Sequence, residues 1–105
     1  MLRIYSTMID ALGGLRVVLP RIARFDSDLA RQLRRAAASV ALNISEGSGS
    51  SGGNRTQRYR TALGSARETA ACLDVAIALG YVERIDASLR AQLDVVIGGL
   101  VRLTV

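Results

Sequence analysis

The 105-residue chain contains 14 arginines, no lysine, no histidine, nine acidic residues and one cysteine, and its formal net charge is +5. Without histidine it cannot form a Ser-His-Asp triad, a Cys-His pair or a histidine-ligated metal site, and without lysine it cannot form a Schiff base or a Walker phosphate site. We therefore expect no enzyme activity, no cofactor and no metal. The length fits one domain that spans residues 1–105.

Residues 2–19 have the apolar periodicity of an amphipathic helix. The residues on its predicted buried face are Ile4, Met8, Ala11, Leu12, Leu15 and Leu19. Pro20 follows directly, and a proline has no backbone N–H with which to continue a helix. We therefore expect Pro20 to end this helix or to kink it.

A second amphipathic helix is predicted for residues 27–46, with Asp26 or Ser27 as its N-cap and Gly47 as its C-terminal stop. Its predicted buried face comprises Leu29, Leu33, Ala36, Ala37, Val40 and Ile44. A row of four polar residues runs along one flank of this face and comprises Arg35, Ser39, Asn43 and Glu46. Because the edge of an apolar stripe is half-buried, these groups need hydrogen-bond partners.

The third helix is predicted for residues 55–79, with Asn54 as its N-cap and Gly80 as its end. One apolar face comprises Tyr59, Leu63, Ala66, Ala70, Leu73 and Ile77. Gly64, Cys72, Val75 and Leu79 lie nearly opposite, among Thr61, Ser65 and Glu68. A helix that is apolar on two faces needs two partners, and we favour a second subunit as the partner of the second face. The alternative is one wide stripe that helices of the same chain cover.

The fourth helix is predicted for residues 86–104, with Asp86 at its N-cap. Its apolar stripe comprises Leu89, Leu93, Val96, Ile97, Leu100 and Leu103. Four amphipathic helices on short connections predict an all-α, up-and-down antiparallel four-helix bundle. Alanine, valine, isoleucine, leucine, methionine, phenylalanine, cysteine and glycine make up 59 of the 105 residues. This exceeds the usual share of ~45–50% and also favours burial between subunits.

The connection after the second helix contains the pattern G-x-G-x-x-G, from Gly47 to Gly52. A dinucleotide-binding fingerprint needs a strand before this pattern and a helix that opens within it. Here a helix precedes the pattern, so we interpret it as an interhelical loop. Its backbone N–H groups and the start of the third helix could still contact a phosphate.

The polar row suggests a network between the second and third helices. We expect Arg35 to pair with Glu46 or Glu68, while Ser39, Asn43 and Ser65 complete the hydrogen bonds. Such a network would fix how the two helices dock, a role in specificity rather than in added stability. A Glu46–Glu68 carboxylate pair for acid–base chemistry or a metal is the less favoured alternative.

The basic charge permits a nucleic-acid partner, because arginine forks suit phosphate groups. The candidate nucleic-acid-binding residues are Arg16, Arg24, Arg55, Arg58 and Arg60. In the alternative interpretation Arg60 pairs with Asp74 or with another subunit, and Arg58 is merely solvated. With only four aromatic residues, binding by charge and shape is expected rather than sequence-specific recognition. A protein partner with an acidic surface is the second hypothesis.

The expected location is the cytoplasm. The longest uncharged stretch, Ala36–Ser45, is far shorter than a membrane-spanning helix, and the N-terminal sequence has no signal-peptide pattern. Cys72 has no second cysteine with which to form an internal disulfide, which fits a reducing compartment. We expect its thiol to be buried as a small apolar side chain.

Two segments carry the motifs of a known family, QLRRAAASVALNISEG (32–47) and ALGSARETAACLDVAIALGYV (62–82). Together they resemble the bacterial four-helix-bundle family named after proteins encoded by intervening sequences in 23S ribosomal RNA genes. The residues that match the family pattern in the first segment are Gln32, Leu33, Arg34, Arg35, Ala36, Ser39, Val40, Asn43, Ile44, Ser45, Glu46 and Gly47. In the second segment they are Gly64, Ser65, Glu68, Leu79, Gly80, Tyr81 and Val82.

The resemblance implies an up-and-down bundle that assembles into a ring of five identical subunits. It implies no settled biochemical activity. A related branch, similar to the accessory variability determinant of diversity-generating retroelements, is a basic pentamer that binds a reverse transcriptase and nucleic acid. The chain departs from the family in the stretch GSGSSGGN (47–54), which is uncharged where the family often carries charges.

Overall fold

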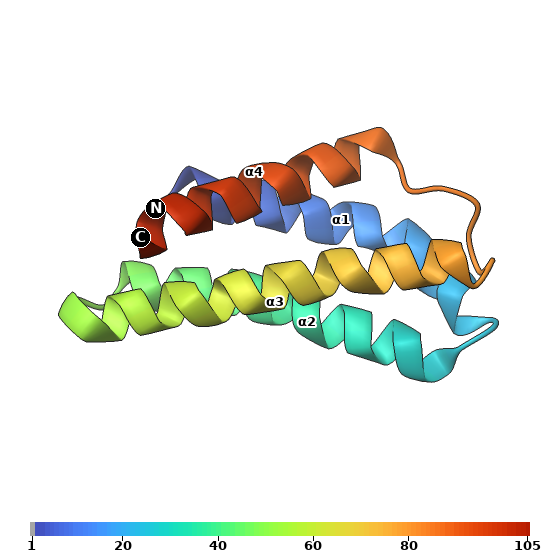
Figure 1. Cartoon of the computed structure of the whole chain (residues 1–105), viewed down its shortest axis with the longest axis horizontal. Coiled ribbons are helices and arrows are strands. Elements are labelled where there is room, and N and C mark those ends of the chain that lie inside the picture. The colour runs from blue at the N-terminus through green and yellow to red at the C-terminus, as the bar shows by residue number, and fades with distance from the viewer. Residues whose placement is uncertain (1) are drawn as a thin grey trace.

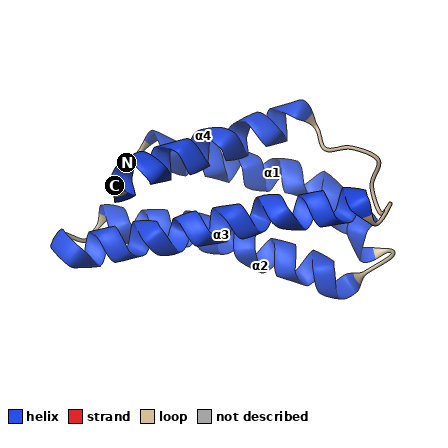
Figure 2. Cartoon of the chain, in the orientation of Figure 1, coloured by secondary structure: helices blue, strands red, loops and turns tan. Residues whose placement is uncertain are grey.

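The computed structural model describes residues 2–105, which form four α-helices and no strand. The helices are α1 (Arg3–Ala23), α2 (Ser27–Ser48), α3 (Gly52–Ala78) and α4 (Ala87–Thr104). Each packs against two others, and successive helices run in opposite directions, so both chain ends lie at the same end of the bundle (Figure 1). Short connections join α1 to α2 and α2 to α3, whereas a longer one joins α3 to α4 (Figure 2). The predicted all-α, up-and-down arrangement of four helices is therefore confirmed.

The core lies where the four apolar stripes meet. From α1 it contains Ile4, Met8, Ala11 and Leu15, together with Val18 and Ile22. The predicted faces of α2 and α4 are also largely buried, although Leu103 is 40% exposed. The core packs tightly, since a Cβ placed on Gly99 would lie 2.5 Å from Ile4 Cγ2.

Three of the predicted helix ends are confirmed by their hydrogen bonds. Asp26 caps α2 by accepting the Leu29 N–H (2.9 Å), and Asp86 caps α4 by accepting the Ser88 N–H (3.0 Å). Gly80 ends α3 with a φ of +78°, a backbone conformation that favours glycine. The Gly80 N–H donates to the Ile77 carbonyl and the Tyr81 N–H to the Ala76 carbonyl. These two bonds form a Schellman motif.

The prediction that α1 ends or kinks at Pro20 is wrong about the end, since the helix continues to Ala23. Pro20 cannot donate to the Arg16 carbonyl, which removes one helical hydrogen bond. The next turn nevertheless brings Ile22 into the core, where its side chain is fully buried. Burying an isoleucine offsets a lost hydrogen bond that faces water.

The boundaries on either side of the α2–α3 connection also differ from the prediction. Gly47 does not stop α2, because it lies inside the helix beneath the Tyr59 ring. A Cβ at Gly47 would lie 2.4 Å from Tyr59 Cε1, so the glycine allows a close approach of α2 and α3. Asn54 is not the N-cap of α3, which begins at Gly52 after Ser51. Arg55 Nε donates to the Gly47 carbonyl in the last turn of α2 (3.3 Å) and to the Ser50 carbonyl in the short connection (2.8 Å).

The predicted second face of α3 is narrower than expected. Cys72 does not lie on it, because the residue is only 4% exposed and packs in the core. Val75 and Leu79 are exposed, at 43% and 58%. Val75 lies about 60° around the helix from Cys72, which is enough to move its side chain from the core to the surface. Only the outer part of the predicted face is therefore exposed.

None of the helices described here is both long and apolar enough to cross a membrane.

Candidate functional site

Three polar contacts join α2 to α3 along one flank, and we call them the polar seam. They run from Gln32 Nε2 to Glu68 Oε2 (3.3 Å), from Ser39 Oγ to Ser65 Oγ (2.9 Å) and from Arg58 Nη2 to Glu46 Oε2 (3.1 Å). The three α2 members are seven residues apart, a spacing that keeps side chains along one line between two packed helices. The polar row predicted from the sequence therefore faces α3.

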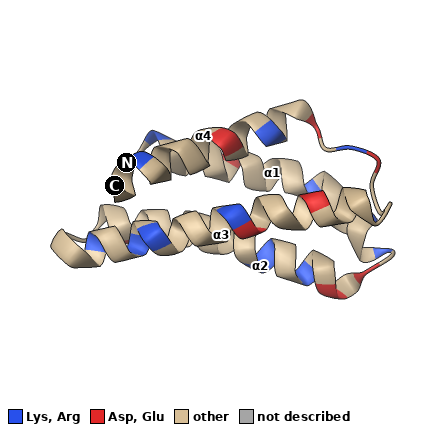
Figure 3. Cartoon of the chain, viewed as in Figure 1, with Lys and Arg blue, Asp and Glu red and all other residues tan. Residues whose placement is uncertain are grey.

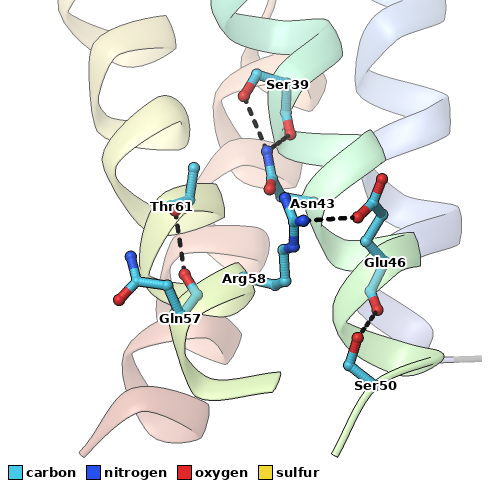
Figure 4. Close-up of polar contacts among 7 residues, drawn as sticks. All are labelled: Ser39, Asn43, Glu46, Ser50, Gln57, Arg58 and Thr61. Carbon is cyan, nitrogen blue, oxygen red and sulfur yellow. Dashed lines mark hydrogen bonds and ion pairs between the residues drawn. The ribbon is translucent and has the colours of Figure 1, made fainter. Parts of the chain in front are cut away.

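Asn43 ties the middle of the seam to the α2 backbone. Its side-chain amide donates to the Ser39 carbonyl (2.9 Å) and to Ser39 Oγ (3.1 Å) (Figure 4). Ser39 Oγ therefore meets both Ser65 and Asn43, as the network hypothesis expected. No buried side-chain nitrogen or oxygen within residues 2–105 lacks a hydrogen-bond partner.

The expected pairing of Arg35 with a glutamate is wrong. Glu46 lies eleven residues further along the same helix, which is about 16 Å at 1.5 Å per residue. It pairs instead with Arg58 of α3 (Figure 4). Glu68 accepts a hydrogen bond from Gln32, and Arg35 forms no ion pair with any carboxylate in the described part of the chain. Gln32 is the seam residue that sequence reasoning missed, although its spacing to Ser39 could have indicated it.

An open groove of about 550 Å³ lies between α2 and α3 beside the seam, and we call it the α2–α3 groove. Its lining residues are Asp28, Arg31, Gln32, Arg35, Ala36, Ser39, Ser65 and Glu68. Both signs of charge are present, so the groove is polar without favouring an anion or a cation. No group of three or more metal-ligating side chains occurs among residues 2–105, and the two glutamates Glu46 and Glu68 have separate partners.

Cys72 lies in the core, one helical turn after Glu68, which lines the α2–α3 groove. Burial, and secondarily the Glu68 carboxylate, raises the pKa of its thiol above the ordinary value. A thiol with a raised pKa is mostly protonated at neutral pH and is a poor nucleophile. The expectation of a buried cysteine that acts as a small apolar side chain is confirmed.

The five arginines proposed from the sequence do not come together. Arg55, Arg58 and Arg60 lie near the beginning of α3, where Figure 3 shows blue bands, whereas Arg16 and Arg24 belong to the second half of α1 and its end. Arg55 and Arg58 are engaged within the chain by carbonyl groups and by Glu46.

The suggested pairing of Arg60 with Asp74 does not occur, because Asp74 pairs with Arg90 of α4.

A denser group of arginines surrounds the connection between α1 and α2, and we call residues 16–35 the basic hairpin. Its arginines, all exposed, are Arg16, Arg21, Arg24, Arg31, Arg34 and Arg35. Only Arg31 among them forms an ion pair in the described structure, with Asp28 (2.8 Å). Sequence reasoning named only Arg16 and Arg24 of these six as nucleic-acid-binding candidates, although the density of arginines along the chain was a visible signal.

The two carboxylates of the basic hairpin are both engaged. Asp28 pairs with Arg31. Asp26 caps α2 through one oxygen and accepts the Tyr81 hydroxyl through the other (3.3 Å). Tyr81 also stacks on Phe25, with ring centroids 5.5 Å apart and an interplanar angle of 5°. Burial, and then the Asp26 carboxylate and its hydrogen bond, raise the pKa of Tyr81.

A second groove, of about 380 Å³, lies between α1 and α2 within the basic hairpin, and we call it the α1–α2 groove. Its lining residues are Leu19, Pro20, Ala23, Ser27, Ala30, Arg31 and Arg34. Four of them are apolar, two are arginines and none is acidic. The electrostatic character of this groove therefore favours an anion.

Comparison with known proteins places the chain in a family. The structure is similar to the crystal structure of a protein with unknown function from the S23 ribosomal protein family of Bacteroides thetaiotaomicron. The TM-score is 0.69 at 15% sequence identity, over 96% of this chain and 91% of that one. A search of curated proteins gave no match. The family described as 23S rRNA-intervening sequence protein matches residues 19–101, most of the chain. The chain therefore belongs to the 23S rRNA-intervening sequence protein family.

Proposed function

We propose that the chain is the subunit of a non-enzymatic, ring-like homo-oligomer that binds RNA or DNA by charge and shape. The basic hairpin is the observation that carries the proposal. The basic hairpin contains six exposed arginines and only two aspartates, and both aspartates already have partners within the chain. Exposed arginines without carboxylate partners leave a positive potential that attracts a phosphate backbone.

The exposed part of α3 supports assembly. Val75 and Leu79 are apolar side chains one turn apart on the outer surface of α3. A second copy that covers them would bury apolar area which a monomer leaves in water. The proposed number of subunits, five, follows the family resemblance.

The experiment is size-exclusion chromatography with light scattering, recorded at 260 and 280 nm in low and high salt. With three tyrosines and no tryptophan the protein absorbs weakly at 280 nm, so bound nucleic acid is easily seen. We expect a mass near five times the 11.2 kDa of one chain and a 260 nm excess that high salt removes. A monomer would contradict the ring, and a protein that takes up no RNA or DNA at low salt would contradict the binding function.

A protein partner is the second candidate function, for example a polymerase that uses the chain as an accessory subunit. The α2–α3 groove favours it, because it carries charges of both signs, and the exposed Val75 and Leu79 follow its Glu68 by seven and eleven residues on the same side of α3. Charged and apolar groups together suit the mixed surface of a protein interface. An assembled ring that stays free of nucleic acid at low salt would favour this candidate over the first.

A further inference from the structure

We propose that the α1–α2 groove holds one unpaired nucleotide of an RNA or DNA strand, with the phosphate at its arginine rim and the base on its apolar floor. The inference rests on the proposed nucleic-acid binding and adds the place and the form of the ligand. It predicts that single strands bind more tightly than duplexes.

The rim of the groove carries the phosphate-binding groups. Arg34 is exposed and forms no ion pair with any carboxylate among residues 2–105. Its planar guanidinium can therefore donate two parallel hydrogen bonds to a phosphate. Arg31 keeps N–H donors beyond the one that Asp28 accepts, and its side chain is 56% exposed. Arg16 adds a third positive charge, since it lies one turn before Pro20 on the same side of α1.

The floor of the groove suits a base. It consists of small or rigid apolar side chains, with Pro20 and Ala23 exposed, Leu19 half-buried and Ala30 only 8% exposed. Bases have apolar faces and polar edges, and Ser27 supplies a hydroxyl among the lining residues. At about 380 Å³ the groove falls at the lower end of the range of small-ligand sites, which is about 300–1,000 Å³.

A duplex cannot use both parts of the groove. Its bases are stacked and paired, so it offers phosphates, sugars and base edges but no free base face, whereas an unpaired nucleotide offers both a phosphate and a base face. Binding to the rim alone is a charge interaction that any basic surface provides. The apolar floor is thus the feature that points to a single strand.

The α2–α3 groove is a poorer phosphate site although it also contains two arginines. Asp28 and Glu68 line it, and a carboxylate on the wall repels a phosphate that approaches the arginines. Arg35 lies in this groove and Arg34 in the other, so two adjacent arginines provide a matched pair for an experiment.

The test measures the binding of the full chain to a fluorescently labelled 20-nucleotide single strand and to the matching duplex, by fluorescence anisotropy at low salt. The variants Arg34→Gln and Arg35→Gln each lose one positive charge. We expect Arg34→Gln to weaken single-strand binding by about tenfold, the effect of a lost hydrogen bond to a charged group. Arg35→Gln should show only the much smaller loss that follows from the change in net charge.

The apolar floor is tested without a change in charge. Ala23→Leu fills the floor, and Ala91→Leu is the control because Ala91 is an exposed alanine of α4 outside both grooves. We expect Ala23→Leu to weaken single-strand binding by about fivefold or more, because the filled floor can no longer bury the apolar face of a base, and to leave duplex binding unchanged. Circular dichroism and light scattering check that every variant keeps its fold and its oligomeric state.

The outcomes separate the two levels of the proposal. If the unaltered chain binds neither strand form, the proposed nucleic-acid function fails. If it binds both forms equally and Arg34→Gln matches Arg35→Gln, that function stands and the nucleotide site is wrong. If Arg34→Gln dissociates the oligomer, the groove is an interface between copies. If a free mononucleotide binds as tightly as the strand, the ligand is a small molecule. Either result, the dissociated oligomer or the tightly bound mononucleotide, would overturn the inference.

Discussion

The two grooves on either side of α2 differ in their chemistry although they share a wall. Arg31 lines both of them, and each contains one further arginine from the same helix. The α3 side contributes Glu68 and Ser65, whereas the α1 side contributes Leu19, Pro20 and Ala23. The neighbouring helix therefore decides whether the α2 arginines face the Glu68 carboxylate or an apolar floor. A count of arginines alone would not distinguish these surfaces.

The largest expected effect comes from a core substitution in α2, the helix that lines both grooves. Leu33 is fully buried in α2 between them, and Leu33→Ala should lower the free energy of unfolding by about 2–5 kcal/mol. Urea unfolding at a fixed protein concentration measures it. Val17→Ala is the control, because Val17 is 60% exposed and its truncation should change stability by less than about 0.5 kcal/mol. Equal losses in the two variants would contradict the described core.

A second substitution acts on the α3 side alone. Gly47→Leu places a side chain where the Tyr59 ring lies and should lower the free energy of unfolding by about 1–3 kcal/mol. Gly13→Leu is the matched control, since Gly13 is exposed within α1 and a Cβ there meets nothing within 4 Å. In an exposed helical position this replacement should stabilise by up to about 1 kcal/mol. Thermal unfolding of both variants should therefore give opposite signs, and a stabilised Gly47→Leu would refute the close packing.

The middle of the polar seam can be measured with a double-mutant cycle of Ser39→Ala and Ser65→Ala. We expect a coupling energy of about 0.5–1.5 kcal/mol, the value of one hydrogen bond between hydroxyls.

Asn43→Leu removes the amide that holds Ser39 and should disturb helix packing or assembly. Unchanged melting temperature and oligomeric state in Asn43→Leu would remove the docking role from the seam.

The Arg58–Glu46 ion pair of the polar seam should contribute less to the free energy of unfolding than the Ser39–Ser65 hydrogen bond. The side chains of Arg58 and Glu46 are 49% and 60% exposed, so Glu46→Gln should change the free energy of unfolding by less than about 1 kcal/mol. The difference should shrink further in 1 M salt, which screens exposed charges. If 1 M salt leaves the stability difference of Glu46→Gln unchanged, the ion pair is not screened by solvent, which would contradict this prediction.

The smallest expected effect concerns the turn beside the α1–α2 groove. The pKa of Tyr81 is raised in the folded chain, so the protonated hydroxyl is favoured there relative to the unfolded chain. Its contribution to stability is complete below the ordinary tyrosine pKa and is lost as the pH rises through the higher, folded value. Tyr81→Phe keeps the stack on Phe25 but should show a weaker decline in stability above about pH 10. Identical pH profiles in urea unfolding would contradict the Tyr81–Asp26 contact.

Local signals predicted the fold well where they act within one helix. Asp26, Asp86 and Gly80 mark helix ends through their own hydrogen bonds or backbone conformation. The errors arose where tertiary packing decided the outcome. Pro20 is predicted to end or kink α1, but the helix continues to Ala23 and buries Ile22. Gly47 is predicted to stop α2, but it lies inside the helix and allows the close approach of Tyr59.

The polar row was predicted as a site, but its partners were not. Helical angles place Ser39 and Glu46 on a flank without saying which residue of α3 stands opposite each. Arg58 is therefore predicted to bind nucleic acid although it pairs with Glu46. Arg35 is predicted to pair with a glutamate although it forms no ion pair within residues 2–105. The α1–α2 groove was missed because its floor and rim come from two helices, and their register is a property of the packed bundle.

The most direct measurement of the central claim is photocrosslinking of the assembled protein to a single-stranded RNA that contains 4-thiouridine, followed by mass spectrometry of the crosslinked peptides. The account predicts crosslinks between residues 19 and 34, where the α1–α2 groove lies. Excess unlabelled single strand should remove them, and an equal amount of duplex should do so less effectively. Crosslinks concentrated at residues 55–68 of α3, with none in the α1–α2 groove, would contradict it.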